Sequence, residues 1–270
     1  MTEQETTATI TPAVAPGPPP VRRGAVVFAV LFVVAMITVG TVNTLSDLVE
    51  STVEQSTTIV PQGRALSVEA LTGDIEIGPS PDGNVHVRTT VEYGLTRPEL
   101  TEQANADEVF LASRCDGVVV AECQVDYDVL VPPDFPVYAE TRSGHVRLSG
   151  LTGPLTVRTT TGDVTLSGVA GTIDVRAQSG GIRGSELRSP SVTTRTASGN
   201  VDLDLLSPPQ LIDAVVTGGD IDLRVPGASR YRVTAEAPDG DQTVSVPTDP
   251  GSANTITART SAGRVRVAPR

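Results

Sequence analysis

Two aspartates in the C-terminal half of the sequence are the residues best suited to acid–base chemistry. Asp202 and Asp222 each lie three residues after a glycine of a repeated pattern, with Asp204 and Asp220 close by. Such paired carboxylates could hydrolyse a polysaccharide, with one acid activating water and the other protonating the leaving group, or they could bind Ca²⁺. No histidine, lysine or aromatic platform accompanies them. We therefore interpret them as surface acids and predict no catalytic residue, no metal site and no cofactor.

Three arginines form a second candidate site. Arg158, Arg176 and Arg195 each lie four residues before a glycine of the same pattern. If equivalent positions of the repeat stack, the three guanidinium groups are neighbours on one outer face and could bind carboxylated or phosphorylated surface polymers. The alternative is a solvated face that nearby acids neutralise and that keeps the protein soluble.

The two cysteines of the chain, Cys115 and Cys123, are eight residues apart, and no histidine lies nearby to complete a metal site. Outside the cell such a pair indicates a disulfide. A two-residue turn at Asp116 and Gly117 would pair Cys115 with Val118 rather than with Cys123. The disulfide therefore requires a longer loop or a short meander.

A repeat of alternating strands positions these candidates. Residues 155–166, LTVRTTTGDVTL, form two short strand-like stretches joined by a turn at Gly162. Seven other glycines align with Gly162 in the same pattern: Gly73, Gly144, Gly180, Gly199, Gly219, Gly240 and Gly263. We call these eight residues the anchor glycines. A large aliphatic residue stands seven positions before each of them, and valine or isoleucine stands two positions after each, except at Gln242.

This pattern predicts an all-β protein. Apolar residues at every second position indicate strands with one buried face. From Gly144 onward the anchor glycines are 18 to 23 residues apart, which is too short for helix-pair repeats and is typical of a stacked β-solenoid. A β-sandwich is the alternative, although it gives no reason for eight repeats of one pattern. The low aromatic content, four Phe, four Tyr and no Trp, fits a narrow coil interior.

The chain divides into four segments. Residues 1–22 are predicted to be a disordered cytoplasmic tail, 23–46 a transmembrane helix, and 47–63 an extracellular polar stalk. Residues 64–270 form the β-solenoid domain, in which 64–131 are an irregular N-terminal part and cap and 132–270 are regular coils. A cleaved signal peptide is the alternative to the membrane helix, but the apolar run is long and has no clear cleavage site.

Charge supports a location at the membrane and outside the cell. Arg22 and Arg23 precede the uncharged run, whereas acidic residues follow it, so the positive-inside bias places the N-terminus in the cytoplasm. The predicted protein is thus a single-pass protein of the cell membrane. A net charge of −12 argues against nucleic acid as a partner.

The rows ETRSGHVRLSGLTG, RTTTGDVTLSGVAG and RTASGNVDLDL, together with the entry VPPDFPVYAETRSG, resemble the putative adhesin family of bacterial surface β-solenoid domains. The resemblance covers residues 64–267. It implies a right-handed coil outside the cytoplasm and provides no catalytic residues. We expect an adhesin-like binding or structural module at the cell envelope, with a surface polysaccharide or another envelope protein as partner. The alternatives are an envelope polysaccharide hydrolase or lyase, and an envelope-stress sensor.

Overall fold

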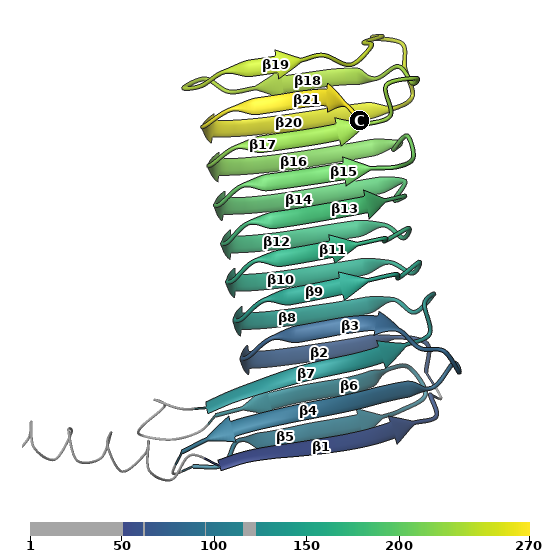
Figure 1. Ribbon diagram of the computed structural model, residues 1–270, viewed down its shortest axis with the longest axis vertical. Coiled ribbons are helices and arrows are strands. Elements are labelled where there is room, and N and C mark those ends of the chain that lie inside the picture. Colours follow the sequence, from purple (N-terminus) through teal and green to yellow (C-terminus); the bar gives the residue numbers. More distant parts are fainter. Residues whose placement is uncertain (1–50, 62, 95, 116–122) are drawn as a thin grey trace, which may run out of the picture. The chain divides into compact units, whose positions relative to one another are not determined.

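The computed structural model describes residues 51–61, 63–94, 96–115 and 123–270 (Figure 1). The expected tail and membrane helix lie outside the described residues. Within the described ranges no helix is long and apolar enough to cross a membrane. These residues contain strands and no α-helix, so the predicted all-β class is confirmed.

The strands form two sheets, which we call sheet A and sheet B. Sheet A contains, in spatial order, β1 (Ser51–Ile59), β4 (Val85–Tyr93), β7 (Cys123–Val131), β3 (Ile75–Pro79), β9 (Val146–Ser149), β11 (Val164–Ser167), β13 (Ile182–Leu187), β15 (Val201–Leu205), β17 (Ile221–Val225), β21 (Val265–Pro269) and β19 (Gln242–Val244). Sheet B contains β18 (Arg232–Glu236), β20 (Thr255–Ala262), β16 (Leu211–Gly218), β14 (Ser191–Ser198), β12 (Ile173–Ser179), β10 (Leu155–Thr161), β8 (Val137–Ser143), β2 (Leu66–Thr72), β6 (Val109–Arg114) and β5 (Glu99–Ala104).

Each regular repeat contributes one strand to each sheet, and we call such a strand pair a rung. Neighbouring rungs pair in parallel and in register: Val164 of β11 lies between Val146 of β9 and Ile182 of β13. All three side chains are completely buried between the sheets. The predicted stacking of equivalent positions is therefore confirmed, and the apolar faces of successive rungs form one continuous core.

The anchor glycines are required by the stacking as well as by the turn. Gly162 has a φ of 135°, which L side chains rarely adopt. In addition, a Cβ at Gly162 would lie 1.9 Å from the carbonyl oxygen of Gly144 in the neighbouring rung. Each turn therefore lies directly against the next, with no room for a side chain.

The N-terminal rungs do not follow chain order. The rung β2–β3 stacks directly on β8–β9, with Leu66 opposite Val137. Its other side pairs with β6 and β7, so that Leu66 is also opposite Val109, and Ile75 is opposite Tyr127. We predicted that the repeat register is lost between residues 83 and 131, but β6–β7 is a further rung. Val125 takes the anchor position of this rung, since its carbonyl oxygen lies 2.1 Å from a Cβ built at Gly73.

Antiparallel strands complete this end of the stack. In sheet A, β4 pairs with β7 and β1 pairs with β4; in sheet B, β5 pairs with β6. Part of the predicted stalk, residues 47–63, is thus a strand of the sheet. The reason is that Val53, Thr57 and Ile59 alternate along β1, and β-branched residues favour a pleated strand even when the segment is largely polar.

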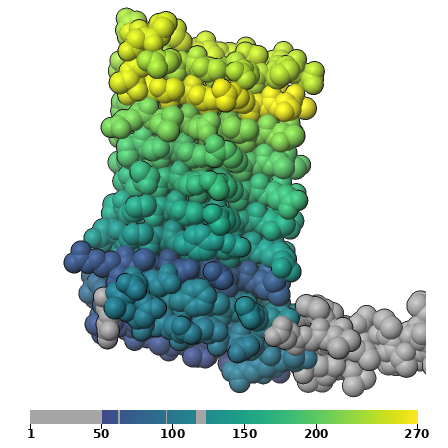
Figure 2. Space-filling view, turned by 180° about the vertical axis from the view of Figure 1, so that it is seen from behind, coloured from purple at the N-terminus to yellow at the C-terminus, as the bar shows by residue number. Residues whose placement is uncertain are grey.

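The C-terminal end also departs from chain order (Figures 1 and 2). The last strands of the chain, β20 and β21, stack on β16 and β17, whereas β18 and β19 lie outside them. The yellow C-terminal band therefore lies beneath yellow-green residues in Figure 2. Gln242, the single exception to the apolar pattern, belongs to this outermost rung. In the orientation that satisfies its amide, its nitrogen donates to the Ala235 carbonyl (2.9 Å) and its oxygen accepts from the Ala237 N–H (3.0 Å).

Candidate functional site

The three arginines that were predicted to be neighbours lie together on the outer face of sheet B. Arg158 on β10 is opposite Arg176 on β12, which is opposite Arg195 on β14. Their side chains alternate with buried residues such as Val157 and Val175, so they project into solvent. We call these three residues the arginine strip.

Each arginine of the strip has a partner beside it. Arg176 forms an ion pair with Asp174 at 3.1 Å, and Arg195 with Asp213 at 2.7 Å. Arg158 instead lies over the ring of Tyr138, with its guanidinium carbon 5.5 Å from the ring centroid, and its Nη1 donates to the Tyr138 hydroxyl at 3.3 Å. Neighbouring acids thus partly neutralise the strip, as the alternative interpretation of the sequence expected.

Tyr138 links the arginine strip to an acid. Its hydroxyl donates to a carboxylate oxygen of Glu140, and Glu140 lies opposite Arg158 on the neighbouring strand. Partial burial, followed by the hydrogen bond to Glu140, raises the pKa of the Tyr138 phenol. The phenol therefore stays protonated at neutral pH and bridges the two charged groups.

The two aspartates that the sequence suggested as a candidate site lie on the opposite face of the stack, on sheet A. Asp202 on β15 and Asp222 on β17 are direct neighbours. Asp222 contacts two arginines, Arg266 at 3.3 Å and Arg224 at 3.8 Å. A carboxylate held by two cations is poorly placed to donate a proton to a leaving group. No group of three or more acidic, histidine or cysteine side chains in the described part of the chain could hold a metal ion.

Ion pairs between rungs are the rule on the outer face of sheet A. Asp163, next to an anchor glycine, accepts from the Gly181 N–H at 2.7 Å and pairs with Arg183 at 2.9 Å. The backbone hydrogen bond, followed by the arginine, lowers the pKa of the Asp163 carboxyl. Asp220 repeats the arrangement with the N–H and the guanidinium of Arg264, at 2.8 and 3.0 Å. These aspartates therefore act in the fold, by joining successive turns.

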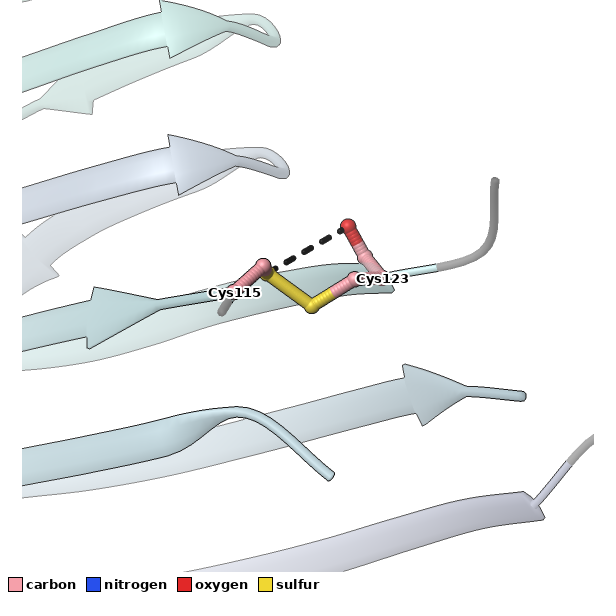
Figure 3. The surroundings of a disulfide bond; sticks show 2 residues. All are labelled: Cys115 and Cys123. Atoms are coloured by element: carbon pink, nitrogen blue, oxygen red, sulfur yellow. Dashed lines mark hydrogen bonds between the residues drawn. A yellow bond between two sulfur atoms is a disulfide. The ribbon is translucent and has the colours of Figure 1, made fainter. Parts of the chain in front are cut away.

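The predicted disulfide is present between Cys115 and Cys123, whose Cα atoms are 6.3 Å apart (Figure 3). It connects the end of β6 to the start of β7. Other rungs cross between the sheets through a tight glycine turn, whereas this rung crosses through a longer segment closed by the disulfide. The bond thus holds the two strands of one rung together where the glycine turn is missing.

Sequence reasoning missed a groove on the outer face of sheet B. The groove has a volume of about 500 Å³ and crosses β5, β6, β2 and β8. Six of the side chains that line it carry charge or an aromatic ring: Glu69, Glu99, Glu140, Arg114, Arg142 and Phe110. These residues are up to 73 positions apart, from Glu69 to Arg142, and two of their four strands, β5 and β6, lie where the sequence showed no register. The outward position of Tyr138 in a repeat row was the one available signal.

Comparison with known protein families matches residues 54–268 to the family described as Toastrack DUF4097. The comparison with curated proteins finds no match.

Three solved structures resemble the chain at low sequence identity. A putative cell adhesion protein from Clostridium sporogenes is 12% identical, with 82% of this chain and 100% of that one covered and a TM-score of 0.36. A putative adhesin from Bacteroides fragilis is 12% identical, with 82% of this chain and 97% of that one covered and a TM-score of 0.34. A putative lipid binding protein from Parabacteroides distasonis is 8% identical, with 80% of this chain and 96% of that one covered and a TM-score of 0.38.

Proposed function

The chain belongs to the Toastrack DUF4097 family, and we propose that it is a membrane-anchored, adhesin-like surface module that binds anionic polymers of the cell envelope. In this proposal the solenoid lies outside the cell and presents the arginine strip to a carboxylated or phosphorylated chain. The module binds its ligand and does not transform it.

The register of the arginine strip is the observation that carries this proposal. Parallel pairing repeats one guanidinium per strand at about 4.8 Å, so a linear polymer that runs along the stack meets several charges in a row. The pairs that Arg176 and Arg195 make with aspartates do not prevent this. Their side chains are 51% and 46% exposed, and exposed ion pairs contribute only about 0–1 kcal/mol. A polyanion can therefore replace the aspartates as partner.

The arrangement of the aspartates supports a binding role over the hydrolase alternative. Asp222 is paired with Arg224 and Arg266. Asp202 lies beside it in a hollow of about 330 Å³, where the other acid, Asp204, is paired with Arg270. A glycosidase needs one free acid and one free base on either side of the scissile bond. Sheet A offers no such pair at this position.

The proposed membrane anchor is the uncharged run that follows Arg22 and Arg23. Its length is sufficient to span a bilayer. Because β1 begins at Ser51, only residues 47–50 separate the end of the run from the first strand. Most of the predicted stalk, residues 47–63, is therefore the strand β1, and residues 47–50 are the part that remains as a linker in this proposal.

The binding proposal is tested with polygalacturonate and inorganic polyphosphate as probes. Changing all three residues of the arginine strip to Gln is expected to weaken binding about tenfold to a hundredfold, because each exposed charge contact contributes about 0.5–1 kcal/mol. Binding of the unchanged protein should weaken as salt is added. Arg259→Gln is the matched control, since Arg259 lies in the same column but is separated from Arg195 by Val215. Equal losses in the strip variant and the control would contradict the proposal.

The anchor is tested separately by mass spectrometry of the intact protein from the membrane fraction. We expect the recovered mass to include residues 1–21. A new N-terminus between residues 40 and 60 would show instead that the apolar run is a cleaved signal peptide.

A further inference from the structure

The groove on sheet B is hollow because of one small residue. Ala112 on β6 occupies the column that holds Glu69 on β2 and Glu140 on β8. On its other side Ala112 faces Thr101 of the antiparallel strand β5. A short side chain between longer ones leaves a floor with raised walls, and this accounts for the volume of about 500 Å³.

The charged side chains of the groove have unused hydrogen-bonding capacity. Within the described residues, Glu69, Glu99, Arg114 and Arg142 form no ion pair and no side-chain hydrogen bond, although all four line one depression. The outer face of sheet A differs, because there Arg147, Arg183 and four further arginines each pair with an aspartate. The groove therefore offers both free acceptors and free donors.

Aromatic surface accompanies these charges. Phe110 on β6 lines the groove and is half-buried. Ser67 on β2 lies opposite both Phe110 and Tyr138, so the two rings project from the same face, about 10 Å apart at their Cα atoms. Of the eight Phe and Tyr residues of the chain, Phe110 lines the groove and Tyr138, over whose ring Arg158 lies, is beside it.

We propose that this groove binds a neutral saccharide chain. Sugar hydroxyls both donate and accept, so they match free carboxylates and free guanidinium groups at once, while the apolar C–H face of a sugar ring can pack on an aromatic side chain. A cationic peptide would leave the two arginines unmatched. A polyanion would meet three glutamates and only two arginines, so the groove would repel it with a net charge of −1. This site goes beyond the proposed function, because it uses different residues and a ligand of a different charge.

The test uses the full-length chain in a detergent that contains no sugar, with cellohexaose and chitohexaose as probes. At least one hexasaccharide is expected to bind in isothermal titration calorimetry, with little dependence on salt. Glu69→Gln and Arg142→Gln should each weaken this binding about tenfold, since each replaces a hydrogen bond to a charged group by a weaker one to a neutral amide. In saturation-transfer NMR, Phe110→Leu should reduce the signals of the sugar ring protons, because it removes the aromatic ring and keeps an apolar side chain at this position.

Two controls separate this proposal from the binding of polyanions. Arg259→Gln, on the same face but outside the groove, should leave hexasaccharide binding unchanged. Glu69→Gln should not weaken the binding of polygalacturonate, which depends on the arginine strip. All variants are compared by melting temperature, because their side chains point outward and the fold should be unaffected. Failure of both hexasaccharides to bind, or equal binding by the groove variants and the Arg259 variant, would overturn the proposal whatever the polyanion result.

Discussion

The middle rungs of the stack and its two ends bury apolar strand faces in different ways. In the middle, every rung is covered by a similar rung, so Val164 packs between Val146 and Ile182, and the pattern continues past a local register shift between Gly184 and Leu187 of β13. At the ends no further copy follows. Antiparallel strands finish the N-terminal end, and Gln242 binds backbone groups of its own rung at the C-terminal end. Repetition therefore provides the core, and departures from it close the open β-edges.

The substitution with the largest expected effect on stability introduces a charge into the core of the middle rungs. Val164→Asp would place a charge without a partner between two sheets, which should cost several kcal/mol out of a total stability of about 5–15 kcal/mol. Asp at Val146, Val201 or Ile221 should be equally damaging. Thr165→Asp, on the outer face, should change stability by less than about 0.5 kcal/mol, whereas Arg147→Asp should cost somewhat more, because it replaces the ion pair with Asp74 by two adjacent carboxylates. Thermal melts of residues 46–270, which form one compact unit, measure the contrast. If the damaging positions did not recur with the anchor glycines, the stacked register would be wrong.

An added methyl group at an anchor glycine distinguishes the middle from the end. Gly162→Ala should cost about 3 kcal/mol, because it combines strained backbone with a contact to the Gly144 carbonyl in a rung that cannot move. Gly240→Ala meets the Gly263 carbonyl at 1.7 Å, but its rung has no neighbour outside, so it can shift and the cost should be smaller. Gly218→Ala, with its nearest contact at 3.9 Å, is the neutral control. Urea denaturation of the three variants gives the order, and equal costs at Gly162 and Gly240 would contradict this difference between the regions.

Removal of the disulfide should destabilise only the N-terminal end of the stack. Replacing Cys115 and Cys123 by Ser is expected to cost about 2 kcal/mol, a low value because the closed loop is short. Hydrogen exchange should become faster in β4 to β7 and stay unchanged in β10 to β15. Free-thiol titration of the unchanged protein should detect no thiol. Faster exchange throughout the stack would show that the end and the middle unfold as one unit.

The smallest expected effect concerns pH and the turns of the middle rungs. The folded pKa of Asp163 lies below its ordinary value of 3.8, so its stabilising effect is fully present at neutral pH. The effect declines as the pH falls through 3.8 and is lost below the lowered pKa. With a side chain 38% exposed, the contribution should remain below about 1 kcal/mol after solvent screening. Asp163→Asn should reduce the acid sensitivity of the melting temperature, and an unchanged pH profile would contradict the assignment.

The sequence was sufficient to predict the structure in the part of the chain where one pattern repeats. The buried positions around Val164, the neighbouring arginines of the strip and the disulfide follow from spacing and topology, and the structure contains all three. The rung β6–β7 could not be recognised, because a disulfide-closed insertion replaces its turn and Val125 replaces its anchor glycine. Strand β1 was missed because its composition is mostly polar and its partner, β4, is far along the chain. The groove required this same tertiary pairing, which no local pattern contains.

The position of β20 and β21 has a consequence for how the protein is made. These strands follow β18 and β19 in the chain and leave the ribosome after them, yet β18 and β19 pair with β20 and β21 and with no earlier strand of the described residues. The strands β18 and β19 must therefore wait for residues 255–269 before they can pair, and assembly cannot proceed in chain order through this part of the stack. A chain that lost only residues 255–270 would lose two rungs, and the newly uncovered edge of β16 and β17 would be free to pair with other chains.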